Sequence, residues 1–361
     1  MNYQHRQETQ TDKAPTVKQV VQELRRWDRE HKPTDLGTRL NLFQYIQNVY
    51  PDGSMTGGRG ALVPLAKGVT RLPQIELRDT AHDQMLARLQ YGKPLYSRLP
   101  EKLNALNINW LIQNEGDRSA LLRMVDKNQA RALMTTAYQP FDNLDLMEAV
   151  LPYVGNGKVK MAYTAEDVFQ ITIIFPKTKT KIKTGDVVER GIYIRNSEIG
   201  KSSVTIAGVL WRANCLNQLI GHSYGGGNYG DGIENKGFKN GRARGEESSF
   251  VRFRHTGDTD RLQSGIQSAI ESCYLESTKL ISQFKQSLKV AVDDPASRLQ
   301  KIVEDNDLTP DDFRQMLDNF MTEPDKNMFG VVNAITATAR DRDGDDQYQL
   351  QRVASRELAT V

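Results

Sequence analysis

Four lysines at alternate positions, in the segment PKTKTKIK at residues 176–183, are the residues whose type and spacing most clearly indicate chemistry. Side chains of an extended strand alternate between its two sides, so Lys177, Lys179, Lys181 and Lys183 would share one side of a hairpin arm. Ammonium groups placed in this way repel one another unless an anion neutralises them. A polyanion gains binding affinity because counterions are released at each phosphate that a lysine contacts. A hairpin that lysines keep soluble, or an edge strand that they protect, is the alternative interpretation.

A second basic segment, GHSYGGGNYGDGIENKGFKNGRARGEES, occupies residues 221–248. Its many glycines predict a long loop without regular structure, and loops of this length are usually functional or disordered. Aromatic side chains stack on bases while neighbouring cations follow the backbone, which is the combination that single-stranded nucleic acid prefers. The residues of these two kinds in the segment are Tyr224, Tyr229, Phe238, Lys236, Lys239, Arg242 and Arg244. A plain flexible connector is the alternative.

The charge of the chain is distributed unevenly, although its net charge is only +3. Residues 158–261 contain 17 Lys and Arg against 11 Asp and Glu, whereas residues 293–346 are acidic. This asymmetry suggests a face that binds polyanions and a C-terminal part that solvates that face or competes for it. Arg190 and Arg195, on the strand expected at residues 188–196, complete the set of predicted nucleic-acid-binding residues.

Composition limits the class of protein. The chain has 361 residues, 38% of them hydrophobic, and a mean hydropathy of −0.57, which indicates a modest core and no membrane partner. The polar N-terminus lacks the apolar stretch of a signal peptide. The two cysteines, Cys215 and Cys273, provide no disulfide framework and are expected to be buried thiols. Together these features predict a cytoplasmic protein.

The sequence contains no recognisable motif for catalysis or for binding a cofactor or a metal. The five histidines have no metal-binding spacing, and the GGRG at residues 57–60 lacks the Gly-Lys-Ser/Thr ending of a phosphate-binding loop. Asp142, Asp145 and Glu148 lie close enough on a short helix to hold a divalent cation, but a helix cap with a solvated face is the commoner arrangement. The segment RDRDGDD at residues 340–346 lacks the glutamate that closes a calcium loop. We therefore expect no enzyme activity, no cofactor and no metal.

Hydrophobic periodicity predicts an α+β fold with a central antiparallel sheet, a covering helix, and helical N- and C-terminal regions. The predicted strands are residues 159–164, 168–175, 188–196 and 203–209, followed by a helix at 210–220 that covers one face of the sheet and leaves the other free. The expected division is a disordered lead (1–15), a helical and loop region (16–90), a central α+β domain (91–255) and a C-terminal helical region (256–361).

Three segments of the chain resemble an uncharacterised family of phage/plasmid-like proteins, a domain of unknown function found in bacteriophages and mobile elements. They are PFDNLDLMEAVLP, RGIYIRNSEIGKSSVTIAGVLWRANCLNQLI and NMFGVVNAITATARD, and the resemblance extends over residues 90–340. Its most specific part is the pattern I-x-N-S-E-x-G, followed by a strand and by Trp211, Arg212, Cys215 and Asn217. The resemblance implies a phage or plasmid gene expressed in a bacterial cytoplasm, and it supplies no catalytic residues.

A second likeness concerns architecture alone. Antiparallel strands followed by a helix, with a basic hairpin and acidic C-terminal helices, resemble the core of phage single-strand annealing proteins, which form rings on DNA. The resulting hypothesis is a protein that binds nucleic acid, with single-stranded DNA favoured, in replication or recombination. Formation of a homo-oligomer is a further hypothesis. The alternative is a factor that targets a host protein, for example in counter-defence.

Overall fold

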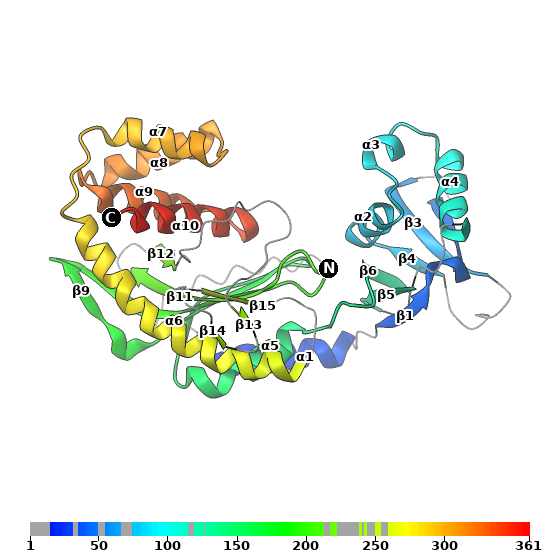
Figure 1. The fold of residues 1–361 in the computed structure, drawn as a ribbon, viewed down its shortest axis with the longest axis horizontal. Coiled ribbons are helices and arrows are strands. Elements are labelled where there is room, and N and C mark those ends of the chain that lie inside the picture. Colours follow the sequence, from blue (N-terminus) through cyan, green and yellow to red (C-terminus); the bar gives the residue numbers. More distant parts are fainter. Residues whose placement is uncertain are drawn as a thin grey trace.

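The chain forms two lobes, a small one and a large one (Figure 1). The structure is a computed structural model, and it describes residues 15–31, 35–49, 55–65, 74–114, 119–126, 128–212, 217–221, 238–239, 242–243, 250–253 and 259–361. The chain begins in the large lobe, builds the small lobe, and then returns to complete the large one. Helices and strands are mixed throughout, which confirms the predicted α+β class.

The small lobe is a six-stranded sheet with three helices. The strand order is β1-β5-β6-β4-β3-β2, and among the described strands all of its pairs are antiparallel except β4 with β6. Its elements are β1 (Leu36–Arg39), β2 (Phe43–Val49), β3 (Met55–Pro64), β4 (Ile75–Leu77), α2 (Asp79–Arg88), α3 (Lys93–Tyr96), α4 (Glu101–Asn114), β5 (Ser119–Met124) and β6 (Gln129–Met134), with a 3-10 turn at Leu40–Leu42. Apolar side chains of α2 and α4 pack with the sheet into one core.

The small lobe departs from the sequence prediction. Residues 16–90 were expected to be helical or loop, yet β1 to β4 lie in this range. The glycines of β3 have a low propensity for strands, so residue propensity alone does not predict this strand. Gly60 is required there, because a Cβ at this position would lie 1.9 Å from the Tyr45 ring of the neighbouring strand. The sheet also joins strands from both sides of residue 90, where a domain boundary was expected.

The large lobe is built on a seven-stranded antiparallel sheet. Its strands are β7 (Lys158–Thr164), β8 (Phe169–Ile174), β9 (Thr180–Lys183), β10 (Asp186–Asn196), β11 (Val204–Arg212), β12 (Asn217–Ile220) and β15 (Phe250–Phe253). The order along the sheet is β12-β11-β10-β8-β7, with β15 on β11 and β9 on β10. The predicted strands at residues 159–164, 168–175, 188–196 and 203–209 are confirmed, and so is the antiparallel sheet.

Helices cover both faces of this sheet (Figure 1). On one face, Ile192, Ile194 and Ile206 pack with α1 (Val17–His31), α5 (Asn143–Val154) and α6 (Thr259–Ser287). On the other face, Tyr193 and Trp211 join the core that includes Tyr348 of α10 (Gly344–Ala359). The expectation of one free face is therefore wrong.

The helix predicted at residues 210–220 is also wrong, because β11 continues to Arg212 and β12 occupies Asn217–Ile220. All described residues of these two strands are buried. A strand that is buried on both faces has no polar alternation, so its apolar run resembles a buried helix in sequence. The helix that actually covers this region is α6, whose backbone comes so close that a Cβ on Gly208 would lie 2.7 Å from the Cys273 carbonyl oxygen. Cys273 is buried, as expected.

Four helices follow α6 in the C-terminal region, which was predicted to be helical. They are α7 (Pro295–Asp305), α8 (Pro310–Thr322), α9 (Met328–Arg340) and α10. Thr309 caps α8 by accepting a hydrogen bond from the Asp312 backbone N–H at 3.2 Å, with Pro310 in the first helical position. The large apolar core beneath these helices includes Phe329, Ile335 and Leu350. Within the described residues, none of the helices is both long and apolar enough to span a membrane.

Candidate functional site

The lysine-bearing segment forms a hairpin with the first part of β10. Lys183 pairs with Asp186, and Lys181 pairs with Val187, across a turn at residues 184–185 in which Gly185 has a φ of +79°. Pro176–Thr178 form a 3-10 turn that leads into β9. Figure 1 shows β9 at the end of the large lobe that is remote from the small lobe. The predicted hairpin is confirmed, and we call the 3-10 turn, β9 and the facing part of β10 the basic hairpin.

The predicted period-2 alternation applies only within β9, because Lys177 lies in the 3-10 turn and Lys179 ends that turn. Thr178 and Ile182 are buried, whereas Lys177, Lys179 and Lys181 are exposed. Ile182 packs into the apolar core beneath the C-terminal helices, which fixes the orientation of the strand. Three ammonium groups therefore extend into solvent from an anchored strand. The nearest carboxylate recorded for them is Glu189, whose Oε1 lies 3.9 Å from Lys179 Nζ.

The fourth lysine is turned inward. Lys183 forms an ion pair with Asp325, its Nζ lies 4.7 Å from the centre of the Phe329 ring, and its side chain is 33% exposed. The expectation that all four ammonium groups are open to a ligand is wrong for this residue. Lys183 attaches the hairpin to the C-terminal helices instead.

Arg190 of β10 lies on the side of the hairpin that faces α6, beside an aromatic residue. Its Nη1 donates a hydrogen bond to Thr278 Oγ1 at 2.9 Å, and its guanidinium carbon lies 4.9 Å from the centre of the Tyr274 ring. Tyr274 is 40% exposed and contacts Phe175 edge-on, with ring centres 5.9 Å apart. The helical spacing of Tyr274 from the buried Ile270 would by itself indicate a core position. The exposure of Tyr274 depends on how α6 is positioned along the sheet, and a single sequence does not give that position.

Arg195 is not available to a ligand. It is 7% exposed, forms an ion pair with Asp345 and lies 4.9 Å from the centre of the Tyr348 ring. The cause is α10, which covers the face of the sheet that was expected to be free. The interpretation of Arg195 as a nucleic-acid-binding residue is therefore wrong in this conformation.

The predicted residues of the glycine-rich segment lie mostly outside the described residues. Tyr224, Tyr229, Lys236 and Arg244 belong to this group. The backbone is described at β13 (Phe238–Lys239) and β14 (Arg242–Ala243), where Lys239 pairs with Arg242. These two short strands correct the expectation that the whole segment lacks regular structure.

Acidic residues of the C-terminal region meet basic residues of the sheet. Besides Lys183 with Asp325 and Arg195 with Asp345, the buried Arg212 contacts Glu323 at 3.0 Å. Arg212 also forms a bidentate contact with Asp186, with both oxygens 2.8 Å from its Nε. The uneven charge of the sequence thus has a structural counterpart, because the acidic end neutralises the inner side of the basic middle.

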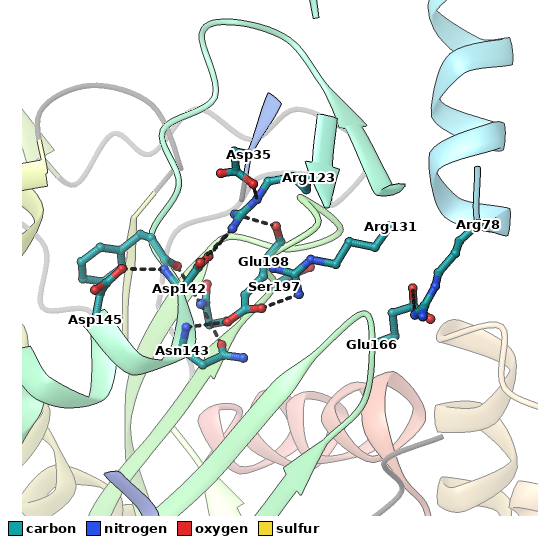
Figure 2. A network of polar contacts seen from close by, with 12 residues as sticks. Asp35, Arg78, Arg123, Arg131, Asp142, Asn143, Asp145, Glu166, Ser197 and Glu198 are labelled. Atoms are coloured by element: carbon teal, nitrogen blue, oxygen red, sulfur yellow. Dashed lines mark hydrogen bonds and ion pairs between the residues drawn. The ribbon is translucent and has the colours of Figure 1, made fainter. Parts of the chain in front are cut away.

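The junction of the two lobes holds the most extensive buried polar network (Figure 2). Arg123 of β5 has a side chain that is only 2% exposed. Its Nη2 donates to both oxygens of Asp142 at 2.7 and 2.8 Å, its Nε donates to Asp35 at 2.9 Å, and its Nη1 donates to the Glu198 carbonyl at 3.0 Å. One guanidinium of the small lobe therefore contacts both α5 and the β10–β11 turn of the large lobe.

Glu198, in the β10–β11 turn, makes the second link between the lobes. Its Oε2 lies 2.6 Å from Arg131 Nη1 of β6, and its Oε1 accepts the Asn143 backbone N–H at 2.8 Å. The Tyr138 hydroxyl lies 3.2 Å from the Glu198 carbonyl, and burial raises the pKa of Tyr138 to about 12, so that it donates there as a neutral phenol. A more exposed pair, Arg78 with Glu166 at 3.1 Å, lies at the side of the junction (Figure 2).

The residue types of the I-x-N-S-E-x-G segment, at the end of a strand, are typical of a turn that its own side chains satisfy. That holds for Ser197, whose Oγ accepts the Lys201 N–H at 3.1 Å. Glu198, in contrast, reaches across the junction, and Asn196 Nδ2 donates to the Phe141 carbonyl at 3.0 Å. Gly200 has a φ of +75° and faces Met134 of the small lobe. The segment serves as an inter-lobe connector, a role that becomes visible only when both lobes are placed.

The carboxylates considered for metal binding have other partners. Asp142 binds Arg123 and occupies the N-cap of α5, and its backbone N–H donates to Asp145 at 3.2 Å. Burial raises the pKa of Asp145. Glu148 contacts Arg25 of α1 at 2.7 Å. In the described part of the chain, no cluster of three or more His, Cys, Asp or Glu is arranged for a metal.

Comparison with known proteins adds no identification. No protein-family model, curated protein or solved structure matches this chain. The resemblance to phage/plasmid-like proteins stays a prediction, and the function has to be argued from the geometry of the chain itself.

Proposed function

We propose that this protein binds nucleic acid through the basic hairpin, with single-stranded DNA favoured. The observation that carries the proposal is the group of three exposed lysines on the basic hairpin, Lys177, Lys179 and Lys181. The buried Ile182 anchors the hairpin that carries them. Each phosphate neutralised by a lysine releases counterions, so a row of ammonium groups gains affinity for a polyanion in proportion to its length.

The neighbouring Arg190–Tyr274 pair supports single strands over duplex. The half-exposed Tyr274 ring is held by Phe175 on one side and by the Arg190 guanidinium on another. An unpaired base stacks on such a ring with a gain of about 1–3 kcal/mol, while a base inside a duplex is already stacked on its neighbours. Lysines for phosphates on one side of the hairpin and an aromatic ring for a base on its α6 side are the two components of the proposed single-strand site.

The biological setting of this proposal comes from the sequence. The likeness of residues 90–340 to phage/plasmid-like proteins supports a phage or plasmid gene expressed in a bacterial cytoplasm. The architectural likeness to single-strand annealing proteins supports a role in replication or recombination. The glycine-rich segment, with its aromatic and basic residues, would extend the same interface.

A titration over salt concentration tests the proposal. Fluorescence anisotropy with labelled single-stranded and duplex oligonucleotides of roughly 20 nucleotides gives the affinity for each form. The expected result is tighter binding of the single strand and a linear fall of log affinity with log salt. A hairpin that only maintains solubility would show no binding at low salt, and that result would contradict the proposal.

A further inference from the structure

Helix α4 carries an exposed apolar stripe on the small lobe. Leu103, Leu106 and Trp110 are 46%, 65% and 62% exposed, and they follow an i, i+3, i+7 spacing on one side of the helix. The buried residues Asn104 and Ile108 lie on the opposite side, since the helix advances by about 100° per residue. An amphipathic helix ordinarily exposes polar groups where α4 exposes two leucines and a tryptophan.

The orientation of α4 is fixed by hydrogen bonds to the edge strand β2. Asn109 Oδ1 accepts the Tyr45 N–H at 2.7 Å, and Asn109 Nδ2 donates to the Tyr45 carbonyl at 2.8 Å. Gln113 Nε2 lies 3.3 Å from the Phe43 carbonyl oxygen. These amides replace a neighbouring strand and hold the helix in one rotation. The stripe therefore faces outward because the inner side is committed to β2.

The chemistry of the stripe favours an uncharged partner. No charged residue occurs from Leu103 to Asn114, and the charges of α4 are confined to Glu101 and Lys102 at its first turn. A charged partner would lose hydration at this surface without gaining an ion pair. Tryptophan is a residue type that often dominates interface energetics.

We propose that two copies of this chain associate through α4, packed antiparallel about a two-fold axis at Leu106. In this arrangement Leu106 faces Leu106 of the second copy, and Leu103 faces Trp110 of the second copy. The charged first turn of one helix lies toward the uncharged last turn of the other. Parallel packing would instead place Glu101 beside Glu101. A stripe that complements itself in this way is what a two-fold interface requires.

The size of the stripe sets the strength of the association. Stable interfaces bury about 800 Å² on each partner, and three side chains on one helix provide less than that. The dimer should consequently be weak and should depend on protein concentration. In Figure 1, α4 lies toward the end of the longest axis of the molecule, so the dimer should also be markedly longer than the monomer.

Sedimentation velocity over about 1–200 µM tests the association, because this range brackets micromolar affinity. The full chain should shift from monomer to dimer, and Leu106→Glu should stay monomeric at every concentration. Met321→Glu is the matched control, since Met321 of α8 is equally exposed, at 66%, but lies in the large lobe; it should dimerise like the parent. A parent chain that remains monomeric, or a Leu106→Glu variant that dimerises normally, overturns the proposal.

Crosslinking tests the geometry. Leu106→Cys should form a disulfide-linked dimer under mild oxidation, and a mixture of Leu103→Cys and Trp110→Cys should crosslink with each other more than either does with itself. The parent chain under the same oxidant controls for its native cysteines. Self-crosslinking of Leu103→Cys alone would indicate parallel packing and overturn the antiparallel arrangement. A host protein that occupies the stripe of a strictly monomeric chain would overturn the proposal as well.

Discussion

Arg131 and Glu198 lie 2.6 Å apart, from Nη1 to Oε2, at the junction of the two lobes, and their side chains are only 7% and 10% exposed. Arg131 belongs to the small lobe and Glu198 to a turn of the large lobe. Removing two charges from water is costly, so the pair adds little net stability compared with an apolar contact. The pair instead fixes the position of one lobe against the other, because a shift of either lobe would leave a buried charge without its partner.

The first prediction concerns this pair. Glu198→Ala should lower the free energy of unfolding by about 3 kcal/mol or more, because it leaves the Arg131 charge buried and unpaired. Glu166→Ala removes a more exposed inter-lobe ion pair, whose carboxylate is 44% exposed, and should cost less than about 1 kcal/mol. Urea unfolding of both variants measures the two costs. Equal losses would mean that burial at the junction does not govern the stability.

The second prediction compares two glycines at the two ends of β10. Gly185 and Gly200 both have positive φ, so alanine at either position should cost about 1–2 kcal/mol through backbone strain. A Cβ on Gly185 meets open space, whereas a Cβ on Gly200 would lie 2.2 Å from Met134 Cε. Gly200→Ala should therefore be the more destabilising change. Adding Met134→Ala should reduce the excess, and an excess that persists in the double variant would contradict the steric explanation.

Much of the fold was predictable from local patterns, whereas the junction was not. The strand at residues 188–196 and the hairpin at Gly185 follow from period-2 alternation and turn chemistry, which are local properties. The strands β11 and β12 were predicted as a helix because burial on both faces removes the alternation. Glu198 was assigned to a self-contained turn because its partner Arg131 lies in a different lobe. The interpretation of Lys183 failed for the same reason, since Asp325 is distant in sequence and close in space.

The third prediction concerns pH. His82 is buried with its Nε2 2.9 Å from the Tyr45 hydroxyl, and burial lowers its pKa. Asp79 and Asp83 oppose this shift, and Lys93 adds to it. The unfolded chain, with a histidine pKa of about 6.5, then binds a proton more readily than the folded chain. The contribution to stability is complete above about pH 6.5 and is lost as the pH falls toward the folded pKa.

Unfolding in urea at about pH 7.5, 6.5 and 5.5 checks the third prediction. The parent chain should lose up to about 1.4 kcal/mol per pH unit from this group below about pH 6.5. His82→Gln should show a smaller slope over the same interval, whatever its absolute stability. Identical slopes would show that His82 does not titrate between the folded and unfolded states.

The fourth prediction separates stacking from charge at the proposed site. Tyr274→Ala should weaken single-strand binding by about 1–3 kcal/mol and leave the salt slope unchanged, because a stacked base releases no counterion. Duplex binding should change less. Leu275→Ala, at the adjacent and 72% exposed position of α6, is the control and should bind like the parent. A uniform loss for both forms of DNA would assign Tyr274 a structural role instead.

The most direct test of nucleic-acid binding by the basic hairpin is the salt slope of single-strand affinity for the parent chain and for Lys177→Gln/Lys179→Gln/Lys181→Gln. Lys183 is left intact in this variant because it anchors the hairpin to Asp325. Each lost phosphate contact flattens the slope of log affinity against log salt by about 0.7, so the triple change should flatten it by about 2. Equal slopes and equal affinities between about 50 and about 200 mM salt would contradict the account and reduce the lysines to a solubility device.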